Sequence, residues 1–89
     1  MKSHLTPQFR KLFEKLPEAI QNLARKNYLL WRKNPSHPSI EFKKVHTTLP
    51  IYSVRIGEDW RALGQRDGDA IVWFWIGSHS QYDKLLKRK

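Results

Sequence analysis

Residues 51–77 read IYSVRIGEDWRALGQRDGDAIVWFWIG and decide the fold, because three short segments with strand character follow one another between turns. Ile51–Ile56 and residues 60–66 alternate in side-chain character with a period of two, which is typical of half-buried strands. Residues 70–76 are apolar on both faces, so we expect a central strand that is covered on both sides. These patterns predict an antiparallel sheet.

Short turns separate the strands of this expected sheet. Residues 67–69 read Asp-Gly-Asp, and the glycine permits the positive φ that tight hairpin turns need. Residues 57–59, Gly-Glu-Asp, form a second tight connection. Ahead of them, residues 40–42 open a further strand that we expect to run to about His46. The sequence thus predicts a three-stranded antiparallel meander with a fourth strand at its end.

The region before Pro38 has helical periodicity. Thr6 and Pro7 form a helix start, because a hydroxyl caps the first turn and a proline there loses no hydrogen bond. Apolar residues recur at helical spacing over residues 9–16, Pro17 interrupts the pattern, and the spacing resumes over residues 20–33. We expect two antiparallel helices, or one helix that is sharply kinked at Pro17.

A short helix is expected to close the chain. Residues 78–81, SHSQ, fit a capping box in which Ser78 caps the helix and Gln81 reaches back. Tyr82, Leu85 and Leu86 give this helix an apolar side. The expected fold is therefore α+β: a helical hairpin packed on a small antiparallel sheet, with a short C-terminal helix, in one domain over residues 1–89.

The chain is strongly basic, with 17 Lys and Arg against 8 Asp and Glu and a formal net charge of +9. Such a charge concentrates polyanions and speeds their capture, which favours nucleic acid as a partner. No apolar run approaches the ~20 residues that span a bilayer, and the N-terminus lacks the apolar stretch of a signal peptide. We expect a cytoplasmic protein with no membrane partner.

Several kinds of chemistry are not expected from this composition. The sequence has no cysteine, which excludes disulfides and thiolate catalysis. The histidines and carboxylates lack the spacing of metal ligands, and no glycine-rich phosphate loop is present. We therefore expect neither a metal nor a small-molecule cofactor.

Three stretches together resemble the RelE/ParE superfamily of bacterial toxins. They are FRKLFEKLPEAIQNLARK at 9–26, NPSHPSIEFKKV at 34–45 and YSVRIGEDWRALGQRDGDAIVWFWIGSHSQYDKLL at 52–86. The family pattern has a tyrosine opening a strand that ends in Arg-x-Gly, an arginine after an aromatic residue, an acidic-Gly hairpin, and an apolar strand leading to His and Tyr. These features fall on Tyr52, Arg55 to Gly57, Trp60 and Arg61, Asp67 and Gly68, His79 and Tyr82. Family members usually begin with a strand, which only Lys2–Leu5 could supply here, so that strand is short or absent.

The resemblance implies a toxin, but it leaves the target open. RelE-like, HigB-like and YoeB-like members cut mRNA on the ribosome, whereas ParE-like members inhibit DNA gyrase; most are held inactive by an antitoxin. The leading expectation is a ribosome-dependent mRNA endonuclease (an mRNA interferase) that inhibits translation, with mRNA on the ribosome and an antitoxin as partners. The alternatives are a ParE-like gyrase inhibitor and a non-catalytic basic domain of the same fold that binds RNA or the ribosome.

Two arginines are the candidates for binding the reacting phosphate. RNA cleavage without a metal needs cations on the phosphate, a base for the 2′-hydroxyl and an acid for the leaving oxygen. Arg61 matches the family's arginine, and its planar fork suits phosphate oxygens. Arg55 lies on the neighbouring strand, where it would widen the same positive strip. The structural alternatives are an Arg61 that is solvated or paired with Asp59 or Asp69, and an Arg55 that holds the adjacent loop.

His79 and Tyr82 are the candidates for proton transfer and base stacking. Histidine exchanges protons near neutral pH, and family members with a histidine here use it on the leaving group. Tyr82 follows three residues later and so shares a helical face with His79. It would stack on a base or bond the phosphate; alternatively it packs with Leu85 and Leu86 as core, and His79 is only a surface residue.

The sequence does not identify which residue acts as the general base. Some relatives use an early glutamate and others use lysines, and the candidates here are Glu41, Lys43, Lys44 and His46. Lys43, Lys44, His46 and Lys84 are also expected to contact the RNA. Ser53 stands where some relatives carry a lysine, which is a departure from the family pattern.

Overall fold

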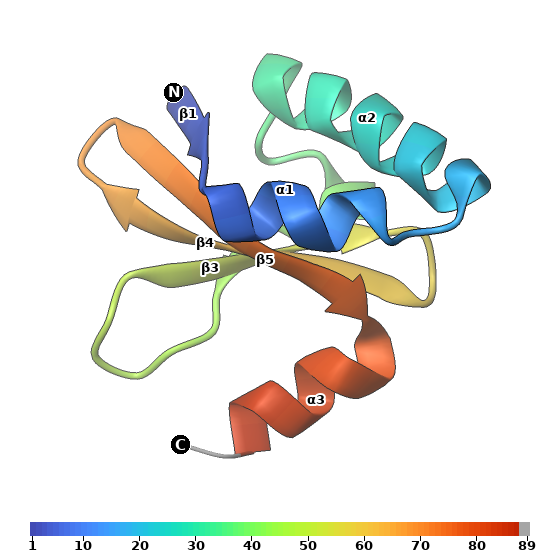
Figure 1. The fold of residues 1–89 in the computed structure, drawn as a ribbon. Helices are drawn as coiled ribbons and strands as arrows, with labels where there is room; N and C mark the ends of the chain where they lie inside the picture. The colour runs from blue at the N-terminus through green and yellow to red at the C-terminus, as the bar shows by residue number, and fades with distance from the viewer. Residues whose placement is uncertain (88–89) are drawn as a thin grey trace.

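The computed structural model describes residues 1–87 and has three helices on the two faces of a five-stranded sheet (Figure 1). The strand order is β1-β5-β4-β3-β2. The elements are β1 (Lys2–Leu5), α1 (Pro7–Glu14), α2 (Glu18–Lys33), the 3-10 helix η1 (Pro38–Ile40), β2 (Lys43–Lys44), β3 (Ile51–Ile56), β4 (Trp60–Asp67), β5 (Ala70–Ser78) and α3 (His79–Lys87). The expected α+β class is confirmed; residues 88–89, included in the expected domain, lie outside the described residues.

The helical hairpin consists of two separate helices. The Thr6 hydroxyl accepts a hydrogen bond from the Phe9 N–H at 3.0 Å, and Pro7 occupies the first turn of α1. Pro17 stands between α1 and α2, because a proline inside a helix removes a hydrogen bond and clashes with the preceding turn. Figure 1 shows α1 and α2 on one side of the sheet and α3 on the other.

The short N-terminal strand is present. Lys2–Leu5 pairs in parallel with β5, with Ser3 opposite Ile71. The remaining neighbours pair antiparallel, so the sheet is mixed rather than wholly antiparallel. β1 closes one edge of β5, and β5 is therefore an interior strand.

The expected strand over residues 40–46 is largely wrong. Pro38–Ile40 forms a 3-10 turn, and Glu41 adopts a left-handed backbone with φ of 48°. Only Lys43 and Lys44 then pair with β3. The burial of Ile40, which is 1% exposed, pulls this segment towards the core and breaks the extended backbone. The sequence showed the β-propensity of the segment, but the tertiary contact of Ile40 overrides it.

A bulge interrupts the alternation expected along β5. Leu63 pairs with Trp75 and Gly64 pairs with Trp73, so Phe74 is the extra residue. The bulge lets both Trp73 and Ile76 face the helical hairpin, where they are 4% and 2% exposed. Phe74 and Trp75 are only half-buried. The strand β5 is therefore fully covered on the side of the helical hairpin and only partly covered on the other side, where full coverage was expected.

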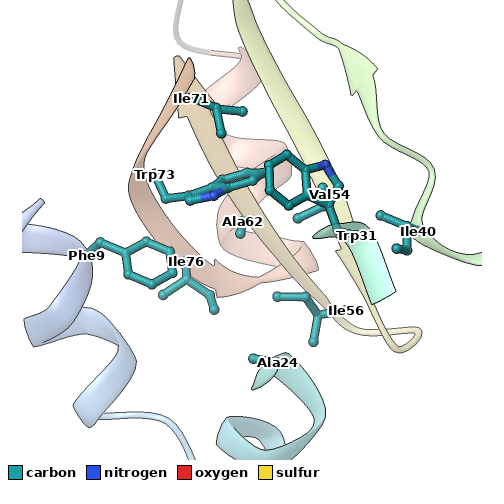
Figure 2. Packing of buried hydrophobic residues seen from close by; sticks show 10 residues of the cluster. All are labelled: Phe9, Ala24, Trp31, Ile40, Val54, Ile56, Ala62, Ile71, Trp73 and Ile76. Carbon is teal, nitrogen blue, oxygen red and sulfur yellow. The ribbon is translucent and has the colours of Figure 1, made fainter. Parts of the chain in front are cut away.

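The core lies between the helical hairpin and the sheet, and Figure 2 shows how its side chains converge. Trp31 of α2, 2% exposed, packs edge-on against Trp73 with ring centroids 5.4 Å apart and an interplanar angle of 77°. Trp31 also meets Phe42 edge-on at 5.7 Å. Edge-to-face pairs of this kind stabilise beyond their buried area, by about 0.5–1.5 kcal/mol each.

Gly64→Ala tests the close packing at the bulge. A Cβ at Gly64 would lie 2.7 Å from Trp73 Cε3 and 2.8 Å from Ile71 Cδ1, so the indole or the isoleucine must shift. We expect the free energy of unfolding to fall by about 1–3 kcal/mol, measured by urea denaturation. Gln65→Ala, an exposed neighbour on β4, is the control and should change it by less than about 0.5 kcal/mol. A Gly64→Ala effect no larger than the control would contradict this packing.

Candidate functional site

The start of α3 is fixed by hydrogen bonds that confirm the predicted capping box. Gln81 N–H donates to Ser78 Oγ at 3.1 Å, and Ser78 N–H donates to Gln81 Oε1 at 3.1 Å. The His79 N–H donates to the carbonyl of Asp59 at 2.6 Å. His79 is thereby held beside the turn that joins β3 to β4.

The two candidate arginines lie directly opposite each other in the sheet. Arg55 of β3 pairs with Arg61 of β4, and Arg61 in turn pairs with Gly77 of β5. Val54 and Ala62 belong to the core, so by strand alternation both arginines point to the opposite face, on the side of α3. Because Gly77 lies two residues before His79, the arginines and the start of α3 meet at one end of the sheet.

The two guanidiniums have different partners. Arg55 Nη1 lies 2.9 Å from Glu41 Oε2, and its Nε donates to the Gly57 carbonyl at 3.0 Å. Arg61 Nη1 donates only to main-chain carbonyls, to Trp60 at 2.8 Å and Glu58 at 3.4 Å. Within residues 1–87, no carboxylate forms an ion pair with Arg61. Arg55 thus fits the loop-holding alternative, whereas the charge of Arg61 is not neutralised.

His79 opens onto solvent at the first turn of α3. Its side chain is 47% exposed, and Nε2 lies 3.5 Å from Asp83 Oδ1, one helical turn later. A shallow hollow of about 480 Å³ adjoins it. The hollow is lined by Asp59, Ser78, His79, Ser80, Asp83, Lys84 and Lys87. The histidine is therefore accessible to a large ligand, and the hollow beside it carries two aspartates and two lysines.

Tyr82 is packed inside rather than presented to solvent. It is 6% exposed, and its hydroxyl donates to Ser53 Oγ at 3.4 Å; Ser53 is 2% exposed. The ring stacks beside His79 with centroids 6.0 Å apart. This geometry favours the alternative in which Tyr82 docks α3 onto β3. Ser53, the departure from the family pattern, is the acceptor that this docking uses.

The structure divides the remaining candidates between the two faces of the sheet. Lys43 and Lys44 are exposed on β2 opposite Ser53 and Tyr52, so Lys43 shares the α3 face and Lys44 the hairpin face. His46 Nδ1 accepts from the Leu49 N–H at 3.0 Å and from the Thr48 N–H at 3.2 Å, which holds the loop before β3. Of the possible bases, Glu41 contacts Arg55, and Lys43 lies on the same face of the sheet as both arginines.

Two groups near His79 were not predicted from the sequence. The carboxylate of Asp83 was not singled out, although its spacing of four residues from His79 on a helix is a readable signal. The carbonyl of Asp59 carries no such signal, because its contact with His79 depends on the register of β4 and β5.

Within residues 1–87, no group of three His, Cys, Asp or Glu side chains is arranged to hold a metal ion. The same region contains no helix that is both long and apolar enough to cross a membrane.

Comparison with known proteins relates this chain to a family of toxins. The model of the ParE-like toxin domain matches residues 18–84. A chain of the RelB-RelE antitoxin-toxin complex from Methanococcus jannaschii is 19% identical, with a TM-score of 0.72 over 91% of this chain and 96% of that chain. YafQ from E. coli is 12% identical with a TM-score of 0.72, again covering 91% and 96%. The isolated E. coli RelE toxin is 14% identical with a TM-score of 0.66, covering 98% and 96%. No curated protein matches significantly.

Tyr82→Phe tests the docking of α3. Removing the hydroxyl leaves Ser53 without this partner, so we expect the free energy of unfolding to fall by about 0.5–1.5 kcal/mol. Tyr82→Ala also removes the buried ring and should cost about 3–5 kcal/mol. Both are measured by chemical denaturation, with the exposed Ser80→Ala on the same helix as the control. A Tyr82→Ala protein as stable as the control would show that Tyr82 does not dock α3.

Proposed function

Because this chain belongs to the ParE-like toxin domain family, within the RelE/ParE toxin superfamily, we propose that it is a toxin that cuts mRNA on the ribosome without a metal ion. The observation that carries the proposal is the placement of Arg61 opposite Arg55, at the end of the sheet where His79 begins α3. Among residues 1–87, Arg61 has no carboxylate partner and His79 is accessible, and a cation with a proton-transferring group is what phosphoryl transfer by side chains requires.

In the proposed reaction the 2′-hydroxyl of the RNA attacks the adjacent phosphorus. The new bond joins the 2′-oxygen to phosphorus, and the bond from phosphorus to the 5′-oxygen breaks. Arg61 stabilises the charge that develops on the phosphate oxygens, and His79 gives a proton to the departing 5′-oxygen. The products are a 2′,3′-cyclic phosphate and a free 5′-hydroxyl. Asp83, 3.5 Å from the ring, orients the histidine.

Glu41, which is paired with Arg55, is the general base in this proposal. The side chains of Arg55 and Glu41 are 35% and 43% exposed, and exposed ion pairs contribute only about 0–1 kcal/mol. An RNA phosphate can therefore take the place of Glu41 on Arg55 at little cost. The released Glu41 carboxylate then accepts the proton of the 2′-hydroxyl. Tyr82 would support the site indirectly, because it holds α3 on the sheet.

The charge distribution supports an RNA substrate. Lys43 and Lys84 are exposed on the side of α3, and Lys44 lies on the same short strand as Lys43. With a formal net charge of +9, the chain attracts the phosphate backbone in a salt-dependent way. In this proposal His46 supports RNA binding indirectly, because it holds the loop that follows these lysines in the chain.

We further propose a protein antitoxin as partner and the cytoplasm as the place of action. Three of the similar structures come from RelB-RelE or RelBE2 complexes, and this likeness supports an antitoxin partner. An mRNA target on the ribosome requires a cytoplasmic enzyme. No small-molecule cofactor enters the proposed reaction.

A gyrase inhibitor is the second candidate, and the ParE-like family match favours it. A third is an RNA- or ribosome-binding domain without catalysis, which is favoured by the burial of Tyr82. The exposed His79 beside Asp83 argues for the nuclease, because neither binding function needs a group that transfers protons.

Primer extension on a reporter mRNA in a translating extract tests the proposal. We expect translation-dependent cuts with the wild-type protein, and a loss of roughly 100-fold or more in the cutting rate for Arg61→Ala and for His79→Ala. Arg66→Ala is the matched control, because Arg66 lies on the same strand and belongs to the opposite face.

The outcomes separate the three candidates. Intact mRNA together with inhibited supercoiling by purified gyrase would replace the nuclease with the gyrase inhibitor. Tight ribosome binding without cuts would favour the non-catalytic domain. Equal losses in all three arginine and histidine variants would show that the site lies elsewhere.

A further inference from the structure

An apolar cavity of about 470 Å³ opens between the helical hairpin and the sheet, on the face opposite Arg61 and His79. Its wall combines residues of α1, α2 and the sheet, several of which appear in Figure 2. The most buried of them are Trp31, Ile40, Ile56, Ala62, Trp73 and Ile76. Pockets of about 300–1,000 Å³ with mainly apolar walls are the usual size for small-molecule sites.

The wall includes Trp31 and Trp73, whose indole N–H groups are buried. The indole nitrogens of Trp31 and Trp73 are buried and have no partner within residues 1–87. Their side chains are only 2% and 4% exposed. In Figure 2 the ring nitrogen of Trp73 lies on the side nearer Phe9 and Ile76, two other wall residues. A water molecule is poorly held in such a wall, because ordered water needs two to four polar partners.

The solvent side of the cavity carries two arginines. Arg10 of α1 and Arg25 of α2 both line it, and the Arg25 guanidinium lies 5.1 Å from the centroid of the Phe13 ring. Glu14 is the only carboxylate among the lining residues. A guanidinium fork matches a carboxylate through two parallel hydrogen bonds.

The other polar groups of the wall are already engaged. The Tyr28 hydroxyl is hydrogen-bonded to Ser3, and the Asn27 amide donates to the Arg55 carbonyl at 3.2 Å. Besides the Glu14 carboxylate, the charged groups that line the cavity are Arg10 and Arg25, which favours a ligand with an apolar body and acceptor oxygens.

We propose that this cavity binds an amphipathic carboxylate, such as a medium-chain fatty acid or an aromatic acid. The apolar body lies against Trp31, Trp73 and Phe9, and the carboxylate lies between Arg10 and Arg25. A small molecule fits better than a protein segment, because stable protein interfaces bury about 800 Å² on each partner. Of the exposed large apolar residues, only Leu5 lines this cavity. The inference does not depend on RNA cleavage.

The test is a titration of the ¹⁵N-labelled full chain with decanoate, followed by NMR of the indole N–H groups. The chain has four tryptophans, and only Trp31 and Trp73 line the cavity. We expect these two indole resonances to shift, while those of Trp60 and Trp75 stay in place. Decan-1-ol, the neutral analogue, should bind about tenfold more weakly because it lacks the carboxylate.

Variants separate the cavity from general binding of anions to a basic protein. Ala24→Leu fills the cavity and should abolish the shifts, with thermal unfolding confirming that it folds. Arg10→Gln with Arg25→Gln should weaken decanoate binding about tenfold. The control, Lys11→Gln with Lys26→Gln, makes the same change of charge on exposed positions of the same two helices outside the cavity.

Three results would overturn the proposal. The first is unmoved Trp31 and Trp73 resonances at saturating decanoate. The second is equal affinity in the arginine and lysine double variants, which would leave only non-specific attraction. The third is occupation of the cavity by protein: a dimer in sedimentation that Ala24→Leu dissociates, or an antitoxin peptide that shifts the two indole signals where decanoate does not.

Discussion

The edge-on contact between Trp31 and Trp73 joins the helical hairpin to the sheet, and the placement of the proposed sites on the two faces follows from it. Trp31 is the most buried large side chain of α2, and Trp73 is the residue of β5 that it meets. For Trp73 to reach it, Gly64 on the neighbouring strand must leave room, because a Cβ there would overlap the indole. The bulge at Phe74 lies at this point of close approach.

The bulge also determines where α3 begins. A register shift of one residue moves every later side chain of a strand to the other face. After Phe74, Ile76 returns to the core and Gly77 lies opposite Arg61, so the chain leaves the sheet beside the arginine pair. Without the extra residue, Ile76 would point to the α3 face of the sheet. His79 would then leave the sheet on the side opposite the arginine pair. Core packing on the hairpin face therefore positions the candidate site on the α3 face.

Local signals in the sequence predicted the elements well, and contacts distant in sequence explain what they missed. The turns at Gly57 and Gly68, the Thr6 cap and the Ser78–Gln81 capping box each depend on a few adjacent residues. Because the Gly57 turn is tight, the opposition of Arg55 and Arg61 also followed from sequence. The 3-10 turn at Ile40 and the Arg55–Glu41 ion pair did not, since they depend on how the segment after α2 returns to the sheet.

The contrast between the two arginines shows why fold alone does not assign a function. Both arginines come from neighbouring strands and face the same way, yet the left-handed backbone at Glu41 accompanies a carboxylate that reaches Arg55, while Arg61 has no carboxylate partner in the described part of the chain. Without the Glu41 carboxylate, both guanidiniums would keep only their main-chain partners. The charge available to a phosphate is thus set by a loop outside the meander. Variation in that loop can change the charge at the proposed site without any change in the fold.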